Sequence, residues 1–286
     1  MCASFASLAE NPTRVQQAFL NTKREQSPTG LYGVNLFVLG HPMTILVDDY
    51  LPVITTHLGE TTTIFSKIAS DGSLWVPILE KVFAKRYGNY EHLIGGDTRD
   101  GLAALTGGPS FKLEHFEVDA ETLWNLLLSH DSSGDYIQAG TEGDNDQQQN
   151  AVGLAMGHAY TVLEAKQLTN GTKLIKVRNP WGRETYNGPW SDKSDKWDAQ
   201  SKKEVDLVVD SEDGLFWTDI DTYLANFEYT SINYDARGWA ESKFLMIDDK
   251  TRREGELEVC GPTCTRHTFT LTSTVKQKVF ITAYTW

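Results

Sequence analysis

The sequence lacks a surplus of basic residues, a long hydrophobic run and an even number of cysteines. Its 286 residues carry 26 Lys and Arg against 39 Asp and Glu, a formal net charge of −13. Nucleic acid and anionic membranes need a basic footprint, so neither is predicted as the main partner. No run of 18 apolar residues occurs, and no transmembrane segment is predicted. Cys2, Cys260 and Cys264 cannot all pair within one chain, which favours a reducing compartment.

The composition that is present is typical of a folded protein. Hydrophobic residues make up 40% and aromatic residues 11%, values of a globular chain rather than a disordered one. The opening MCASFASLAENP has no basic flank of the kind that signal peptides carry, so a cytoplasmic location is expected. Cys260 and Cys264 have no second cysteine pair or spaced histidines, which favours two strand-end thiols over a zinc site.

The hydrophobic pattern predicts helices first, then a sheet and then a β fragment, an α+β chain. Helices are expected at 2–9, from Pro12, between the glycine pairs 95–96 and 107–108, at 75–87 and at 120–130. Strands are expected at 31–39, 43–49, 159–165, 173–178, 205–210 and 215–220, with a turn at 40–42 between the first two. A polar loop is expected at 140–151, and the segment 239–286 alternates like antiparallel β structure.

One histidine differs from the other six, which are expected in turns or at surface and edge positions. Gly157-His158 directly precedes the strand at 159–165, and Asn179-Pro180-Trp181-Gly182 follows the next strand. If these strands pair in antiparallel fashion, Asn179 could accept the imidazole N–H, as the third member of a Cys-His-Asn triad does. Trp181 could shield that bond from water. The alternative is that NPWG forms only a tight turn with a buried tryptophan.

These motifs carry a resemblance to a known family. GHAYTVLEA followed by LIKVRNPWGRETYNGPWSD resembles the second half of a calpain-type cysteine protease core. Residues 75–108 resemble the segment that joins the two halves, 213–227 the end of the catalytic domain, and SLAENP the tail of the helix that carries the nucleophile. The resemblance implies a papain-like two-lobed core, with a partial first lobe at 1–94, a second lobe at 95–232 and the start of a β-sandwich domain at 233–286.

The function that the resemblance implies is intracellular cleavage of polypeptides by thiolate attack and acyl-enzyme hydrolysis. It assigns His158 as the general base, Asn179 as the orienting group and Trp181 as the indole shield. Gly96 and Gly157 match positions that present backbone groups to an extended peptide substrate. For Gly96 an ordinary turn is the alternative.

The nucleophile of the family stands in a Gly-Asp-Cys-Trp element at a helix N-terminus. Aligning Ser7-Leu8-Ala9-Glu10 with the tail of that helix places the cysteine before Met1, so we expect a chain without its nucleophile and inactive alone. Cys2 would lie roughly 5 Å further along the helix axis, too far for direct nucleophile–base contact, and is expected to be a small buried thiol. Two explanations stay open: an incomplete copy of an active endopeptidase, and a catalytically inactive binding or regulatory protein.

Calcium is also implied by the resemblance, because calpain cores bind it through acidic side chains and backbone carbonyls in each half. In the second half, Asp192 and Asp213 match the expected acidic positions. Non-acidic residues occupy the other matching positions, which are Thr185, Leu215 and Ser73. Two carboxylates without their companions predict a weak calcium site at best.

Overall fold

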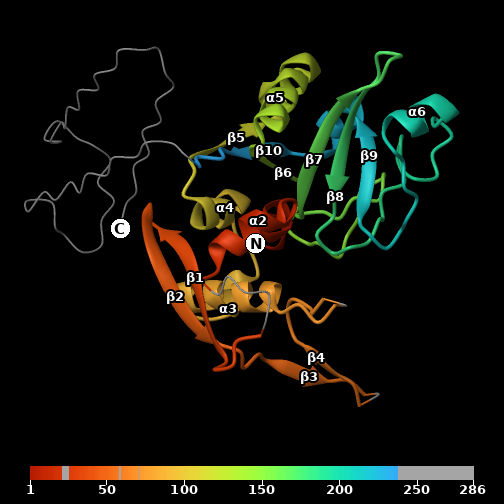
Figure 1. Ribbon diagram of the computed structural model, residues 1–286. Helices are drawn as coiled ribbons and strands as arrows, with labels where there is room; N and C mark the ends of the chain where they lie inside the picture. Colours follow the sequence, from red (N-terminus) through yellow and green to blue (C-terminus); the bar gives the residue numbers. More distant parts are fainter. Residues whose placement is uncertain (21–25, 58, 70, 238–286) are drawn as a thin grey trace, which may run out of the picture. The chain divides into compact units, whose positions relative to one another are not determined.

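The computed structural model describes residues 1–20, 26–57, 59–69 and 71–237 (Figure 1). Its helices are α1 (Cys2–Ala9), α2 (Pro12–Ala18), α3 (Trp75–Tyr87), α4 (Thr98–Thr106), α5 (Ala120–Ser133), α6 (Ala199–Glu204) and α7 (Ile220–Asn226), with 3-10 turns η1 (Glu91–Leu93) and η2 (His115–Glu117). Its strands are β1 (Leu31–Val38), β2 (His41–Asp48), β3 (Val53–Thr55), β4 (Thr61–Thr63), β5 (Ser110–Glu114), β6 (Tyr136–Gly140), β7 (Ala159–Gln167), β8 (Lys173–Arg178), β9 (Leu215–Asp219) and β10 (Tyr229–Asn233).

Helices and antiparallel strands share the described chain, which confirms the predicted α+β class. Six strands form one antiparallel sheet in the order β5-β10-β6-β7-β8-β9, while β1–β2 and β3–β4 form two-stranded sheets. The strand β10 is the last along the described chain, yet it pairs between β5 and β6. The division of the core at residue 94 stays a prediction, and most of the predicted β-sandwich segment 233–286 falls outside the described residues.

The six-stranded sheet and α5 enclose one hydrophobic core. Asp119 begins α5 by accepting the N–H of Thr122 at 2.7 Å, and Gly134 ends it in a left-handed conformation. The buried face of α5 packs against the sheet through Leu123, Trp124 and Leu127. Burying that face removes apolar surface from water, so it fixes α5 on the strands that carry the histidine and asparagine motifs.

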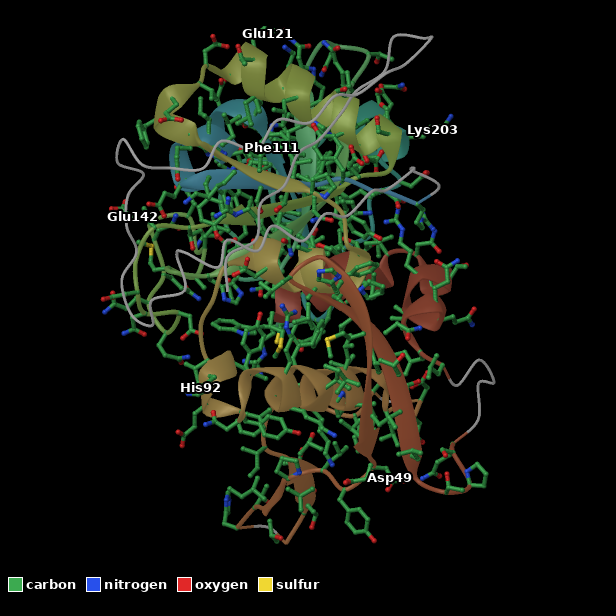
Figure 2. The ribbon with its side chains drawn as sticks, turned by 90° about the vertical axis from the view of Figure 1, so that its left-hand side faces the viewer. Asp49, His92, Phe111, Glu121, Glu142 and Lys203 are labelled. Atoms are coloured by element: carbon green, nitrogen blue, oxygen red, sulfur yellow. The ribbon has the colours of Figure 1, made fainter. Side chains whose placement is uncertain are left out.

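A second core forms between α3, α4 and the β1–β2 hairpin. The predicted helix 75–87 is confirmed, and Ile78, Leu79, Val82 and Phe83 are each 1% exposed or less, whereas Tyr87 at its end is 40% exposed. The buried residues pack with the apolar face of β1 and with the leucines of α4. In Figure 2 the side chains of α3 lie beside the long β1–β2 hairpin, which ends near Asp49.

The short helix α1 packs against β7 through small side chains. The Ser7 hydroxyl donates to Thr161 Oγ1 at 3.2 Å, and the Thr161 hydroxyl donates to the Ala3 carbonyl at 3.1 Å. All three residues are buried, and their small size lets the helix backbone approach the strand closely. This contact fixes the helix beside the strand that follows His158.

Three local predictions are wrong. Residues 205–210 form no strand: they follow α6 as an irregular segment, and Val208 and Val209 are 69% and 61% exposed, because β8 and β9 pair without them. The β1–β2 turn lies at Leu39-Gly40 instead of 40–42, since both residues adopt the positive φ of a two-residue hairpin turn. His115 is buried, at 5% exposure, with its Nε2 2.8 Å from Thr230 Oγ1.

Candidate active site

The strands β7 and β8 bring the two sequence motifs together. They pair in antiparallel fashion, with Thr161 opposite Arg178, so the residues just before β7 lie beside those just after β8. His158 Nε2 lies 3.1 Å from Asn179 Oδ1. The register of one hairpin therefore places an imidazole and a buried amide in hydrogen-bond contact.

The amide of Asn179 decides which imidazole nitrogen carries the proton. The backbone N–H of Trp181 donates to Asn179 Oδ1 at 3.0 Å, which requires an oxygen at that position. The same oxygen can only accept from His158, so Nε2 carries the hydrogen and Nδ1 keeps its lone pair. Asn179 is 1% exposed, and its Nδ2 has no hydrogen-bond partner in the described structure. The arrangement thus presents Nδ1 as the basic atom.

Two aromatic rings hold the imidazole in place. The Trp181 ring lies 4.2 Å from the His158 ring, centroid to centroid, at an angle of 45°. Trp181 is also 46% exposed, so the indole lies between the imidazole and solvent rather than in the core. On another side, the fully buried Tyr160 ring meets the imidazole edge-on at 5.0 Å. Sequence reasoning missed Tyr160, because a tyrosine within a strand carries no signal of its partner.

Electrostatics keep the imidazole neutral. Burial is the main cause that lowers the pKa of His158, and the Met1 ammonium lowers it further, while the Asn179 hydrogen bond and the Asp146 carboxylate raise it. The N-terminal end of α1 lies beside the same strand, because the Ala3 carbonyl accepts from the hydroxyl of Thr161, three residues after His158. A neutral imidazole near pH 7 can accept a proton, as a general base must.

Cys2 is the first residue of α1. The predicted buried thiol is wrong: Cys2 is exposed, because α1 turns Ala3, Ser4 and Ser7 inward instead. Although Cys2 reaches solvent, desolvation by the surrounding protein raises the pKa of its thiol, against the lowering effect of the Met1 ammonium. A nucleophilic cysteine needs the opposite shift. Cys260 and Cys264 lie outside the described residues.

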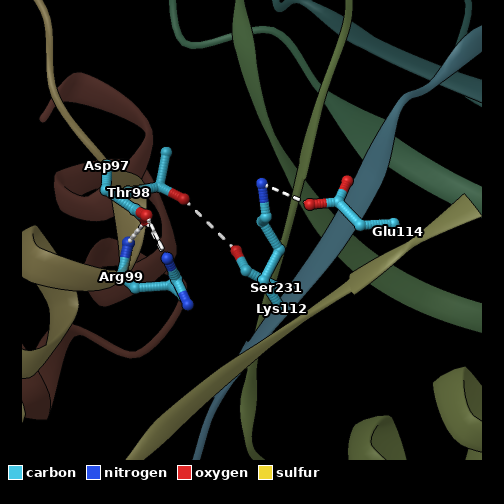
Figure 3. Close-up of polar contacts among 6 residues, drawn as sticks. All are labelled: Asp97, Thr98, Arg99, Lys112, Glu114 and Ser231. Atoms are coloured by element: carbon cyan, nitrogen blue, oxygen red, sulfur yellow. Dashed lines mark hydrogen bonds and ion pairs between the residues drawn. The ribbon is translucent and has the colours of Figure 1, made fainter. Parts of the chain in front are cut away.

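Gly96 has open space beside it, at the start of α4. A Cβ built at Gly96 would meet no atom within 4 Å. The next residue, Asp97, begins α4 by accepting the N–H of Arg99 at 2.9 Å, and the two side chains also form an ion pair (Figure 3). The Thr98 and Ser231 hydroxyls, 3.2 Å apart, attach the helix to β10. The backbone at Gly96 is therefore held in place with room for an approaching chain.

Gly157 is required by the fold itself. Its φ is +55°, and a Cβ there would lie 2.6 Å from the Gly143 carbonyl oxygen. Glycine is the residue that tolerates both conditions. The polar loop that closes at this point carries Glu142 on its exposed side (Figure 2).

The two predicted calcium ligands lie in one acidic region. Asp192 Oδ2 accepts the Asp210 N–H at 2.9 Å, and Glu184 Oε1 accepts the Asp192 N–H at 3.3 Å. Burial, and then the Asp213 and Asp210 charges, raise the pKa of Asp192. Carboxylate oxygens suit a hard cation, but the described residues include no group of three or more acids, histidines or cysteines placed to hold a metal ion. Calcium binding by this acidic region therefore stays a prediction.

One known protein family matches most of this chain. The family model for calpain family cysteine protease matches residues 1–234. The chain belongs to the calpain family of cysteine proteases. The mixture of helices and antiparallel strands is that of a calpain protease core, and in the described part no helix is long and apolar enough to cross a membrane.

Individual calpains resemble this chain over most of its length. Calpain-type cysteine protease ADL1 of Oryza sativa subsp. japonica is 34% identical over 200 residues, which cover 68% of this chain and 9% of that protein. Calpain-5 of Mus musculus is 32% identical over 258 residues, covering 78% and 39%. Calpain-1 catalytic subunit of Homo sapiens is 31% identical over 235 residues, covering 79% and 32%. The chain thus spans well under half the length of these relatives.

Proposed function

We propose that this chain carries the base and the orienting group of a calpain-type cysteine endopeptidase. One observation carries the proposal: the Asn179 carbonyl oxygen, fixed by the Trp181 N–H, accepts from His158 Nε2 and leaves Nδ1 free as a base. The nucleophilic thiol comes from a cysteine outside the 286 residues, at the N-terminal end of the α1 helix. The raised pKa of Cys2 and the contact of Ala3, near that helix end, with Thr161 of β7 support this assignment.

The residues present have defined steps in the reaction. His158 Nδ1 takes the thiol proton, and the thiolate attacks the peptide carbonyl to give a tetrahedral intermediate. The imidazolium then donates its proton to the departing amine, leaving a thioester. Water attacks that thioester as Nδ1 takes its proton, which releases the carboxylic acid and restores the thiol. Asn179 keeps the ring in one tautomer throughout, and Trp181 limits the access of water to their hydrogen bond.

The proposed substrate is an extended polypeptide. The open space at Gly96 and the anchored start of α4 support main-chain recognition there. The fold requires glycine at position 157 whether or not a substrate binds there. Its backbone can still face a peptide. Calcium dependence stays a prediction. Isothermal titration should detect at most weak calcium binding, and tight binding would show that the acidic region gathers further ligands.

The proposal can be tested by adding the missing element. The 286-residue chain should not hydrolyse casein or be labelled by a thiol-directed peptidyl inhibitor. A chain extended at its N-terminus by Gly-Asp-Cys-Trp should be labelled at the added cysteine, while the matched Gly-Asp-Ser-Trp extension should not. His158→Ala should abolish that labelling, and His41→Ala, at an exposed histidine of β2, should leave it intact.

A second candidate function is that of a catalytically inactive binding or regulatory protein. The non-acidic residues at three positions that match calcium ligands of the family, Thr185, Leu215 and Ser73, favour it. In that case the extended chain would fail to react although it is folded, and it would still bind an extended peptide. Labelling of Cys2 that disappears in His158→Ala would instead identify Cys2 as the nucleophile and contradict both assignments.

A further inference from the structure

The polar loop before His158 is closed at its base by one threonine. Thr141 directly follows β6, and His158 directly precedes β7, where the last backbone pair is Gly140 opposite Ala159. The backbone N–H of Thr141 donates to the His158 carbonyl at 3.0 Å. In return, the His158 N–H donates to Thr141 Oγ1 at 3.0 Å. A side-chain hydroxyl therefore completes the last rung between the two strands.

The Thr141 hydroxyl also donates. Its proton is directed to the Ala155 carbonyl at 2.7 Å, with the His158 carbonyl as a longer second acceptor at 3.2 Å. The Ala155 N–H in turn donates to the Tyr160 hydroxyl at 2.8 Å, and the Tyr160 ring touches the imidazole edge. Thr141 is 4% exposed and Tyr160 is fully buried, so water cannot replace these bonds readily.

We propose that Thr141 is a positioning residue that holds the backbone of His158 and, through Ala155 and Tyr160, the packing around its imidazole. This inference rests on the proposed function, because the orientation of His158 matters for catalysis only if His158 is the base. Thr141 touches no reacting atom. Its hydroxyl fixes the position of the His158 backbone, while Asn179 fixes the orientation of the imidazole ring.

The chemistry of the hydroxyl makes the proposal specific. Thr141→Val keeps the shape of the side chain but removes both the acceptor for the His158 N–H and the donor to Ala155. Thr141→Ser keeps both. The charged groups that act on the His158 imidazole are the Asp146 carboxylate and the Met1 ammonium, and neither substitution alters them.

The experiment uses the 286-residue chain and nuclear magnetic resonance, so it needs no activity. In Thr141→Val the His158 amide proton should exchange about tenfold faster relative to wild type, the factor for one buried hydrogen bond. Nitrogen shifts of the imidazole should show a weaker preference for the Nε2–H tautomer. The pKa of His158 should rise towards its ordinary value, because burial is its main lowering cause. Thr141→Ser should match wild type within about twofold in exchange.

The matched control is Thr230→Val in β10. Thr230 is fully buried, and its hydroxyl bonds to His115 and Tyr223 instead of to the candidate site. It should lower the free energy of unfolding without changing the His158 signals. Unchanged exchange and tautomer in a folded Thr141→Val would overturn the proposal. If that variant does not fold, a folded Thr141→Ser that loses His158 protection overturns it equally.

The outcomes separate this inference from the proposed function. If the Cys-extended chain is inactive while Thr141→Val still loosens His158, the proposed function fails and the structural role of Thr141 stands. If the extended chain is active and Thr141→Val changes neither His158 nor the labelling rate, only the inference on Thr141 fails. In an active chain, Thr141→Val should lower kcat and leave KM nearly unchanged.

Discussion

Replacing Glu184 by glutamine should stabilise the protein above pH 7. Burial is the main cause that raises the pKa of Glu184 from 4.5 to about 7, and the charges of Asp192 and Asp213 add to it. The folded protein therefore binds this proton more tightly than the unfolded chain does. Stability contributed by the protonated form is present below pH 4.5 and is lost as the pH rises to about 7.

The size of the effect follows from the two pKa values. The difference between 4.5 and about 7 corresponds to about 3 kcal/mol of free energy if solvent is ignored. Because Glu184 is only half-buried, screening reduces this to about 1–2 kcal/mol. Glu184→Gln removes the charge and keeps an oxygen that can accept the Asp192 N–H. The free energy of unfolding of Glu184→Gln should therefore exceed that of wild type by about 1–2 kcal/mol at pH 8 and by little at pH 4.5.

Urea unfolding at pH values from 4.5 to 8, with calcium removed by a chelator, measures this directly. The matched control is Glu212→Gln, which makes the same change in net charge at an exposed neighbouring position. The control should change the unfolding free energy by less than about 0.5 kcal/mol. If Glu184→Gln changes neither the stability at pH 8 nor its dependence on pH, the acidic region is not arranged as described.

Three further predictions concern packing, backbone and titration. Leu127→Ala should lower the unfolding free energy by about 2–5 kcal/mol, because Leu127 is fully buried. Leu128→Ala, at a neighbour that is 40% exposed, should lower it far less, and denaturant unfolding of both variants tests this. Gly157→Ala should destabilise by more than about 1 kcal/mol, given its positive φ and close carbonyl, and Gly95→Ala, which has open space, should not. The imidazole of His158 should titrate below pH 6.5 when followed by nuclear magnetic resonance, and a value above 6.5 would contradict its burial.

The sequence by itself determined the family, the class of fold and the pairing of two motifs. Hydrophobic spacing located α3, because a stripe repeating every three to four residues has to face a core. Adjacent strands joined by a short connection usually pair, and the pairing of β7 with β8 brings His158 to Asn179. Local pattern is sufficient where the interacting residues are close along the chain.

Only the tertiary structure decided the features that depend on distant neighbours. The apolar segment 205–210 has strand-like composition but no strand to pair with, which no local pattern reveals. The exposure of Cys2 depends on which face of α1 meets β7. Thr141 lies 17 positions before His158, on the other side of the polar loop. Its hydrogen bond to the His158 N–H is therefore visible only in the folded chain. The hydrogen-bond partner of a hydroxyl cannot be read from the sequence, because it depends on the positions of the surrounding strands in the folded chain.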